Sequence, residues 1–530
     1  IARDRVGVRP LFYTIHHGRF IFASEIKSLL EFGGVRAEIS PRVMSQILTF
    51  WTAKSPETVF RDIYEVPPGY YFKLNADGIQ QKKFWELPFR QEADNERRTL
   101  DEVSEEFREL FSDAVRIRLR ADVPVGAYLS GGIDSSVTTA FIKAITPGNL
   151  RTFSIGFNDA EYDETAYQNL VKDYLGTRHT HLKCSAAEIA GIFPDVVWHA
   201  ESPLLRTAPG PMFLLSELVR RENFKVVITG EGADEFLGGY DIFKEALIRE
   251  FWSRDQESKM RPSLLRRLYP YMPQMTNANL AILKLFFGYK LDQVNSPAYS
   301  HLLRWNNTSR IKNYLSDDFK DQIGAYDPVS EILSELDQKF RGTDLLSRAQ
   351  ALEINLFMSG YLLSSQGDRM AMGNSVEGRY PFLDYRVMEF CMNLPRRYKI
   401  RGLNEKILLK HMMSGKLPDQ IIRRPKQPYR APILNSFFSP DAPDYIPQML
   451  SPAQVLGAGI FDPESVSALH AKMRSGKGIS ETDSMAITAI LSAQLMDHLF
   501  IRRSDPLKEA DLPGCIILTT EDHSLINNPC

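Results

Sequence analysis

A glycine–serine turn between an apolar run and a helical pattern is the feature that most restricts how this chain can fold. The turn spans residues 130–136 (SGGIDSS), after an apolar run at 123–129 and before a helical pattern at 137–145. Three more strand-like runs and two more helical patterns follow in alternation, at 152–157, 164–175, 179–182, 211–221 and 224–229. This alternation predicts an α/β domain with a doubly wound parallel sheet, followed beyond residue 240 by a mostly helical part.

The turn has the properties of a phosphate site. A strand, a turn and a helix start bring unpaired backbone N–H groups and the positive helix end to one point. Gly131 and Gly132 let a ligand approach the backbone closely. The turn lacks the Gly-Lys-Ser/Thr ending of a Walker A loop and resembles the PP-loop of the ATP pyrophosphatases, which cleave ATP between the α and β phosphates. The alternative is a structural glycine turn capped by serine and aspartate.

A second loop follows the apolar run at 224–229. It carries three carboxylates within five residues, Glu231, Asp234 and Glu235, beside several glycines. Such crowding is costly unless cations lie among the carboxylates. Loops at the carboxyl ends of parallel strands share one crevice, so Asp134 and Asp234 would both face a triphosphate and could hold Mg²⁺. The alternative is a solvated acidic loop.

Composition narrows the classes of partner. The chain has 530 residues, a formal net charge of −2 and four scattered cysteines without a CxxC pair. A near-neutral chain argues against nucleic acid as a main partner, and the cysteine usage suits a reducing cytosol without a zinc framework. An apolar run of eighteen residues and a signal peptide are both missing from the sequence, which favours a cytoplasmic protein without a membrane partner.

The first 90 residues show short β-like runs separated by turns, at 10–13, 20–23 and 69–74. A polar linker is expected at 91–98, and the spacing of apolar residues predicts a helix over 100–119. The division expected is therefore 1–92, 93–503 and a tail at 504–530.

Five motifs in a fixed order carry a family resemblance: LSGGIDSS at 129–136, SIGF at 154–157, GEGADE at 230–235, SVEGRYPFLD at 375–384 and RPKQ at 424–427. Together they resemble glutamine-hydrolysing asparagine synthetase over about 100–500. Residues 2–13 and 22–27 resemble the closing strands of that family's N-terminal-nucleophile glutaminase domain. The fold implied is a PP-loop domain with a helical C-terminal part, preceded by the β-rich remnant of a glutaminase domain.

The resemblance also implies roles for individual residues. Leu129, Ile155, Thr229 and Gly230 would contact adenine and ribose, partly through the backbone. Pyrophosphate and Mg²⁺ would be held by Ser130, Gly131, Gly132, Asp134, Ser135 and Ser136, with Asp234 as the second metal ligand. Glu231 would handle the ammonia proton and Lys426 would neutralise the α-phosphate. Arg379 would hold a substrate carboxylate or pair with Glu377.

The implied reaction is ATP-dependent activation of the aspartate side chain as β-aspartyl-AMP, followed by attack of ammonia that normally comes from glutamine. The family's glutaminase uses an N-terminal cysteine, whereas the first cysteine here is Cys184. We therefore expect an incomplete N-terminus and ammonia-dependent synthesis by the chain as printed. Two alternatives remain, a relative that amidates another carboxylate (a cell-wall, antibiotic or β-lactam precursor) and a non-catalytic nucleotide-binding protein. A homodimer is also possible.

Overall fold

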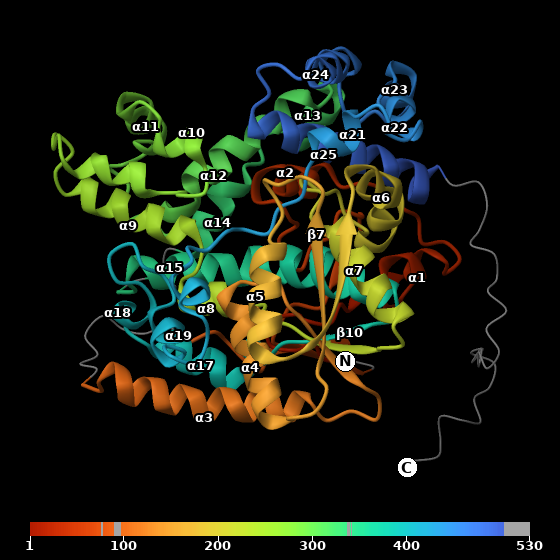
Figure 1. Ribbon diagram of the computed structural model, residues 1–530. Helices are drawn as coiled ribbons and strands as arrows, with labels where there is room; N and C mark the ends of the chain where they lie inside the picture. The colour runs from red at the N-terminus through yellow and green to blue at the C-terminus, as the bar shows by residue number, and fades with distance from the viewer. Residues whose placement is uncertain (76–77, 89–96, 337–339, 341, 503–530) are drawn as a thin grey trace, which may run out of the picture.

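The computed structural model describes residues 1–75, 78–88, 97–336, 340 and 342–502 (Figure 1). The tail expected at 504–530 lies outside the described residues, as does most of the linker expected at 91–98.

A five-stranded sheet in the order β10-β9-β6-β7-β8 forms the centre of the structure, and all of its pairings are parallel. Its strands are β6 (Val125–Tyr128), β7 (Arg151–Phe157), β8 (Arg178–Cys184), β9 (Val226–Ile228) and β10 (Glu377–Arg379). The four strands predicted between residues 123 and 229 are confirmed. Strand β10 was not predicted, because three residues with a central glycine and two charged ends carry no strand pattern.

Helices cover both faces of this sheet. Neighbouring residues of a strand point to opposite faces. Val227 belongs to a buried cluster with Leu215 of α7 (Pro209–Arg221), whereas Ile228 belongs to a cluster with Val137 of α4 (Ile133–Ile145). Helix α5 (Thr165–Leu175) contacts α4, and α6 (Ala186–Ala200) contacts α7. The chain therefore adopts an α/β fold with a parallel sheet between helical layers.

The strand order explains where a site can form. From β6 the chain moves to β7 and β8 on one side, and it then returns to the other side of β6 as β9. Such a reversal leaves a crevice at the carboxyl ends of the two central strands. The loops after β6 and β9 are the two loops that the sequence singled out.

Two helix starts near this sheet have identifiable causes. Helix α3 (Leu100–Arg118) begins at a capping box in which Thr99 and Glu102 satisfy each other's backbone N–H groups. Helix α4 begins at Ile133 rather than at the predicted residue 137, so Asp134, Ser135 and Ser136 lie in its first turn. Its N-cap, Gly132, offers no side-chain cap.

The first 85 residues combine strands with two helices. The antiparallel sheet β2-β1-β3 consists of β1 (Phe12–His16), β2 (Arg19–Ala23) and β3 (Tyr64–Glu65), and a hairpin joins β4 (Tyr70–Asn75) to β5 (Gly78–Lys83). In the chain, helices α1 (Ile26–Leu30) and α2 (Pro41–Phe50) lie between β2 and β3, and neither helix was predicted. The signal for α2 was present, since Ser40 caps it and Pro41 begins it.

This N-terminal region shares its core with the remainder. Phe12 and Ile47 belong to the same buried cluster as Phe193 of α6 and Ile490 of α25 (Glu481–Met496). The buried carboxylate of Glu201 accepts the backbone N–H of Ile26 at 2.9 Å and that of Lys27 at 2.7 Å. One carboxylate therefore caps α1 from across this interface.

The remaining described elements are mostly short helices (Figure 1). Between residues 233 and 336 they are α8 (Ala233–Leu237), α9 (Asp241–Ser253), η1 (Arg261–Arg267), α10 (Pro273–Thr276), α11 (Leu280–Phe287), α12 (Tyr299–Ser309), η2 (Arg310–Tyr314), α13 (Asp317–Ile323) and α14 (Pro328–Leu336). Between residues 345 and 423 they are α15 (Leu345–Leu352), the π-helix η3 (Glu353–Asp368), α16 (Arg369–Gly373), η4 (Pro381–Leu383), α17 (Tyr385–Asn393), α18 (Arg396–Lys399), α19 (Ile407–Met412) and α20 (Asp419–Arg423). The last are α21 (Leu434–Phe438), α22 (Tyr445–Met449), α23 (Pro452–Ala458), α24 (Pro463–Ser475) and the π-helix η5 (Asp497–Ile501). Among the described residues, only the continuous helix Glu481–Ile501 is long and apolar enough to cross a membrane, and most of it is buried inside the protein.

Candidate active site

The loops after β6 and β9 meet at the carboxyl edge of the sheet. Gly230 lies so close to the start of α4 that a side-chain carbon there would come within 2.9 Å of the backbone of Asp134 and Ser135. Any larger residue at position 230 would push the two loops apart. The glycine therefore explains how Asp134 and Asp234, a hundred residues apart, come to face one another.

Two lysines lie between these aspartates and form a ring of four charges. Lys406 Nζ lies 2.5 Å from Asp134 Oδ2 and 2.6 Å from Asp234 Oδ1. Lys426 Nζ lies 2.5 Å from Asp234 Oδ2 and 3.8 Å from Asp134 Oδ2. We call this set (Asp134, Asp234, Lys406, Lys426) the charge ring. It joins the loops after β6 and β9 to two segments from the C-terminal half.

Burial and charge oppose each other within the charge ring. Burial raises the pKa of Asp234, but Lys406 and Lys426 outweigh it and hold that pKa below its usual value. Burial lowers the pKa of Lys426, and Asp234 and Asp134 together raise it above that of a free lysine. Lys426 is therefore an ammonium and Asp234 a carboxylate at neutral pH.

The hydroxyl groups of the PP-loop serines contact other groups of the same loop in this structure. Ser135 Oγ lies 3.0 Å from Ser130 Oγ and donates to the Gly132 carbonyl at 3.2 Å, and Ser136 Oγ donates to the same carbonyl at 2.7 Å. No side chain caps the first turn of α4, so its N–H groups remain open to an anion. Gly131, with φ +77, holds the turn in a left-handed conformation.

Three of the residues proposed to contact adenine and ribose have buried side chains or fixed strand positions, so they can offer a nucleotide mainly their backbone groups. Leu129 is buried against Val171 and Ile421, and Ile155 is a buried residue of β7 itself. The N–H of Thr229 donates to the Arg379 carbonyl at 3.0 Å, which fixes the end of β9.

Two further carboxylates stand next to the charge ring. Burial raises the pKa of Glu231 to about 7, against the opposing effect of Lys426. The Glu231 Oε2 atom is buried and has no hydrogen-bond partner among the described residues. Burial also raises the pKa of Glu235 to about 8, and this carboxyl group accepts the hydroxyl of Tyr240 at 2.7 Å. Glu231 can therefore gain or lose a proton near neutral pH.

The RPKQ segment at 424–427 contacts the PP-loop directly. Arg424 Nη1 donates to the Gly131 carbonyl at 3.4 Å, and its guanidinium pairs with Glu164. The Lys426 backbone N–H donates to Glu405 Oε1 at 3.3 Å. These contacts fix the approach of the Lys426 side chain to the aspartates.

Lys406 was missed by sequence reasoning. Its side chain is 1% exposed, and its backbone has φ +54, a left-handed conformation that is rare for lysine. No spacing rule separates Lys406 from Lys410, which lies one helical turn further on and pairs with Glu405. Only the fold shows that Lys406 reaches the charge ring.

The structure places Arg379 away from these groups. Its Nε donates to Glu377 at 3.0 Å, and its Nη1 donates to the carbonyls of Arg118 and Arg120 at 2.8 and 2.7 Å. Of the two roles that the sequence left open, this geometry matches the ion pair with Glu377. The side chain lines an open cavity of about 420 Å³ beside Arg9.

Asp368 and Arg369 do not pair with each other, although they are adjacent in a motif-rich segment. Asp368 pairs with Arg9, and Arg369 Nη1 lies 2.6 Å from Glu201 Oε2. Asp368 ties the N-terminal region to the remainder through Arg9, and Arg369 does so because its guanidinium lies 4.9 Å from the centroid of the Phe12 ring.

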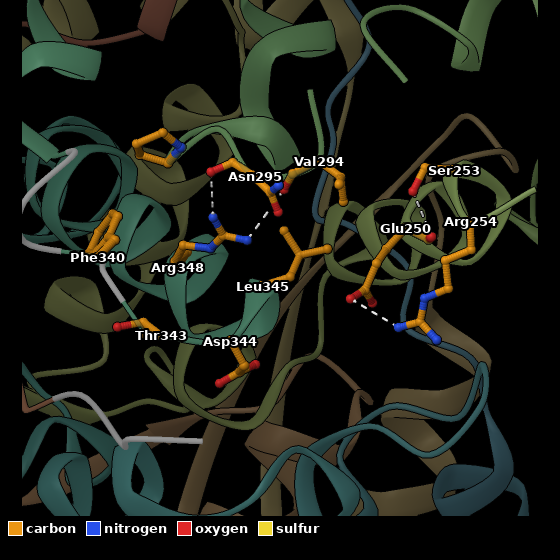
Figure 2. A pocket seen from close by; sticks show the side chains of 12 residues that line it. Glu250, Ser253, Arg254, Val294, Asn295, Phe340, Thr343, Asp344, Leu345 and Arg348 are labelled. Atoms are coloured by element: carbon orange, nitrogen blue, oxygen red, sulfur yellow. Dashed lines mark hydrogen bonds and ion pairs between the residues drawn. The ribbon is translucent and has the colours of Figure 1, made fainter. Parts of the chain in front are cut away.

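A second cavity of about 460 Å³ lies among α9, α15 and the segment before α12, and none of the residues that line it belongs to the charge ring (Figure 2). Arg348 projects from α15 and donates to the backbone carbonyls of Asn295 and Val294 (Figure 2). These contacts close one wall of the cavity.

The donor set of the charge ring fits a magnesium ion only in company with a ligand. Among the described residues, no group of three or more His, Cys, Asp or Glu side chains could hold a metal. Asp134 and Asp234 provide two carboxylates, and Mg²⁺ is commonly bound by one or two carboxylates plus phosphate oxygens. The arrangement can thus bind a magnesium-complexed polyphosphate between carboxylates, ammonium groups and a helix start.

Comparison with known proteins agrees with this geometry. The family model described as asparagine synthase matches residues 106–498, and the model of a glutamine amidotransferase domain matches residues 1–85. Amidase chyE of Penicillium rubens is 30% identical over 492 residues, which cover 87% of this chain and 71% of the relative. Amidase chry2 of Gibberella zeae is 28% identical over 489 residues, with the same coverage.

Bacterial relatives are similar to a comparable degree. Asparagine synthetase [glutamine-hydrolyzing] 1 of Bacillus subtilis is 29% identical over 435 residues, which cover 82% of this chain. The match spans 65% of that relative, just under two thirds of its length. The synthase model alone covers well over half of the chain, and the residues it matches contain the whole charge ring. The chain therefore belongs to the asparagine synthase family.

Proposed function

We propose that this chain is an ATP-dependent amide-forming ligase that activates a carboxylate as an acyl-adenylate, with the side chain of aspartate as the acceptor. Asparagine, AMP and pyrophosphate would be the products. The charge ring carries this proposal, because two carboxylates and two ammonium groups at a helix start match the needs of a metal-complexed triphosphate.

Binding of the nucleotide would exchange the partners within the charge ring. Phosphate oxygens would take over the ammonium groups of Lys406 and Lys426, while Asp134 and Asp234 would hold Mg²⁺. The metal would neutralise phosphate charge as the acyl-phosphate bond forms. Lys426 is the more exposed lysine, with 22% of its side chain accessible against 1% for Lys406. We assign Lys426 to the α-phosphate in the transition state and Lys406 to the β and γ phosphates.

Glu231 is our candidate for the second half of the reaction. Ammonia attacks the activated carbonyl carbon, AMP leaves with the bonding electrons, and the attacking nitrogen must lose a proton. A carboxyl group with a pKa of about 7 can accept that proton at neutral pH. We propose glutamine as the normal source of ammonia, because the N-terminal region matches a glutamine amidotransferase domain.

A second acceptor class has an observation in its favour. Two of the relatives that cover most of this chain are named amidases rather than asparagine synthetases. The charge ring and Glu231 act on the phosphates and the reacting carbonyl, so they would serve another carboxylic acid equally well.

ATP–pyrophosphate exchange tests the proposal, because it requires the adenylation step alone. We expect labelled pyrophosphate to enter ATP in the presence of aspartate, and the Asp234→Asn variant to lose this exchange. Lys472→Met is the control, since the side chain of that lysine is 42% exposed and its partner, Asp483, lies outside the charge ring. Exchange with another acid but not with aspartate would transfer the proposal to the second acceptor class. A chain that exchanges with none of the acids refutes it.

A further inference from the structure

Helix α11 is apolar both on the face that it buries and on the face that it turns to the solvent. Leu283 and Phe287 are buried in a small apolar cluster that joins α11 to α9 and η1. Ile282 and Phe286 are exposed, and Leu285 is 85% exposed. A surface helix normally carries polar side chains on its outer face. The apolar outer face of α11 therefore has the character of a contact surface.

The elements packed against α11 expose two more apolar side chains. Phe251, near the end of α9, and Met260, just before η1, are both exposed. The Arg261 guanidinium lies 4.7 Å from the centroid of the Phe251 ring. Figure 1 shows α10 and α11 at the outer edge of the molecule, away from the central sheet. We call residues 251–291 the α11 corner.

A stretch without acidic residues covers most of the α11 corner. Between residues 258 and 291 the sequence has six basic residues and no aspartate or glutamate, in a chain whose formal net charge is −2. Asp255 and Glu257, just before this stretch, offset only part of its positive charge. The six basic residues are Lys259, Arg261, Arg266, Arg267, Lys284 and Lys290.

These charges border the exposed face of α11. Lys284 is an exposed residue of α11 itself, and its Nζ atom lies 6.0 Å from the centroid of the Trp252 ring. Arg266 and Arg267 are exposed in η1, which contacts α11. The α11 corner therefore presents an apolar helix face with a cationic border.

The surface of an anionic lipid membrane is complementary to both properties. The apolar side chains of an interfacial helix enter the boundary between headgroups and acyl chains, while lysines and arginines attract anionic headgroups. A helix of 8 residues can lie in that boundary without crossing the bilayer. In a symmetric contact between two copies of this chain, by contrast, the cationic borders of both copies would face and repel each other.

We propose that the α11 corner binds the surface of an anionic lipid membrane. Ile282, Leu285 and Phe286 would enter below the headgroups, and the basic residues of 258–291 would lie at the level of the headgroups. This interaction goes beyond the proposed function and does not depend on it, because none of these residues belongs to the charge ring. It revises the expectation of a protein without a membrane partner, which considered only spanning segments and signal peptides.

The Leu285→Gln variant tests the apolar face. Removing one leucine from the acyl boundary should lower the affinity for anionic vesicles about tenfold or more. Leu456→Gln is the matched control, because that leucine is 71% exposed on α23, a helix without lysine or arginine that Figure 1 shows well away from α11. This control should bind like the wild type. Since both leucines are exposed, both variants should keep the wild-type thermal midpoint and pyrophosphate exchange when vesicles are absent.

The double variant Arg266→Gln/Arg267→Gln tests the cationic border. Each basic side chain near an anionic membrane raises the affinity about fivefold, so the double variant should lose roughly 25-fold. Arg220→Gln/Arg221→Gln removes the same charge from an exposed pair at the end of α7 and should leave vesicle binding unchanged. Added salt should weaken the binding of the wild type, because it screens the attraction to the headgroups.

Cosedimentation of the full chain with vesicles measures these affinities. The anionic vesicles contain equal parts of phosphatidylserine and phosphatidylcholine, and the neutral vesicles contain phosphatidylcholine alone. We expect the wild type to sediment with the anionic vesicles and to stay in solution with the neutral ones. Binding to neither, or equal binding to both, overturns the proposal. So does a Leu285→Gln variant that binds like the wild type, or an equal loss in Leu456→Gln.

Sedimentation velocity without vesicles tests the other occupant of this face. A wild type that forms dimers which Leu285→Gln abolishes, and that binds no vesicles, would assign the face to a second copy of the chain and overturn the lipid proposal. Normal vesicle binding by a chain without pyrophosphate exchange would refute the ligase function alone.

Discussion

Replacing Lys406 by methionine separates the structural work of the charge ring from its chemistry. The ammonium of Lys406 lies 2.5 and 2.6 Å from two carboxylates, and its side chain is 1% exposed. At an effective dielectric constant of 20, each contact is worth roughly 6 kcal/mol of Coulomb energy. Most of that is offset by the cost of desolvating the charges, and removing one partner of a buried pair lowers the free energy of unfolding by about 3–5 kcal/mol.

Lys426 provides the comparison within the same ring. Its side chain is 22% exposed and makes one short contact, at 2.5 Å to Asp234. The Lys426→Met variant should therefore lose only about 1 kcal/mol, a value closer to that of a surface pair. Adding Asp134→Asn to Lys406→Met should restore part of the stability, since it removes the carboxylate that was left uncompensated.

Urea unfolding followed by tryptophan fluorescence measures these differences for the single and double variants. The loss in Lys406→Met should be larger at pH 8 than at pH 6, because burial raises the pKa of Asp134 and, without Lys406, the carboxyl group takes up a proton more readily at the lower pH. A Lys406→Met variant as stable as Lys426→Met at both pH values would refute the account of Lys406 as the buried centre of the charge ring.

Three further outcomes follow from the site. Lys426→Ala should lower kcat for pyrophosphate exchange by about 10²–10³, or roughly 3–4 kcal/mol, with little change in the KM for ATP, and a wild-type kcat would assign Lys426 to a surface role. The folded-state pKa of Glu231 is raised above its unfolded value, so the fold loses stability as the pH rises from 4.5 through about 7 and Glu231 ionises. The Glu231→Gln variant should show a smaller loss of unfolding free energy over this pH range. It should also lack the rise in amidation rate through pH 7. Arg379→Ala should lower the free energy of unfolding by roughly 1–3 kcal/mol, because it removes the hydrogen bonds to Glu377 and to the Arg118 carbonyl. The rate of pyrophosphate exchange per folded molecule should stay within a few-fold of the wild type. A large rise in the KM for the acceptor would instead assign Arg379 to substrate binding.

Strands β6, β7 and β9 of the central sheet could be predicted because they are apolar runs close to glycines. These strands are buried on both faces, and such strands give a continuous signal. Strand β10 has only three residues and pairs with β9 from 150 residues away, so only tertiary contacts define it. Helix α2 has a local signal in Ser40 and Pro41, but β-like runs precede and follow it in the chain.

The candidate site was predictable where a motif has a local physical cause. The glycine turn and the acidic loop each follow a strand, so their meeting could be expected from the parallel order. Lys406 could not be found in this way. Its role depends on burial and on contacts with a segment 272 residues away, and a sequence records neither.

The carboxylate of Glu201 has a consequence for how this chain can be divided. It caps α1 through two backbone N–H groups and pairs with Arg369 at 2.6 Å, while its own side chain is fully buried. Cutting the chain between the two regions matched by different family models would take two hydrogen-bond donors away from Glu201, leave it with Arg369, and uncover apolar side chains such as Phe193. The amidotransferase-like segment thus shares a buried core with the synthase-like segment, and a fragment that begins after it would expose apolar surface that the whole chain covers.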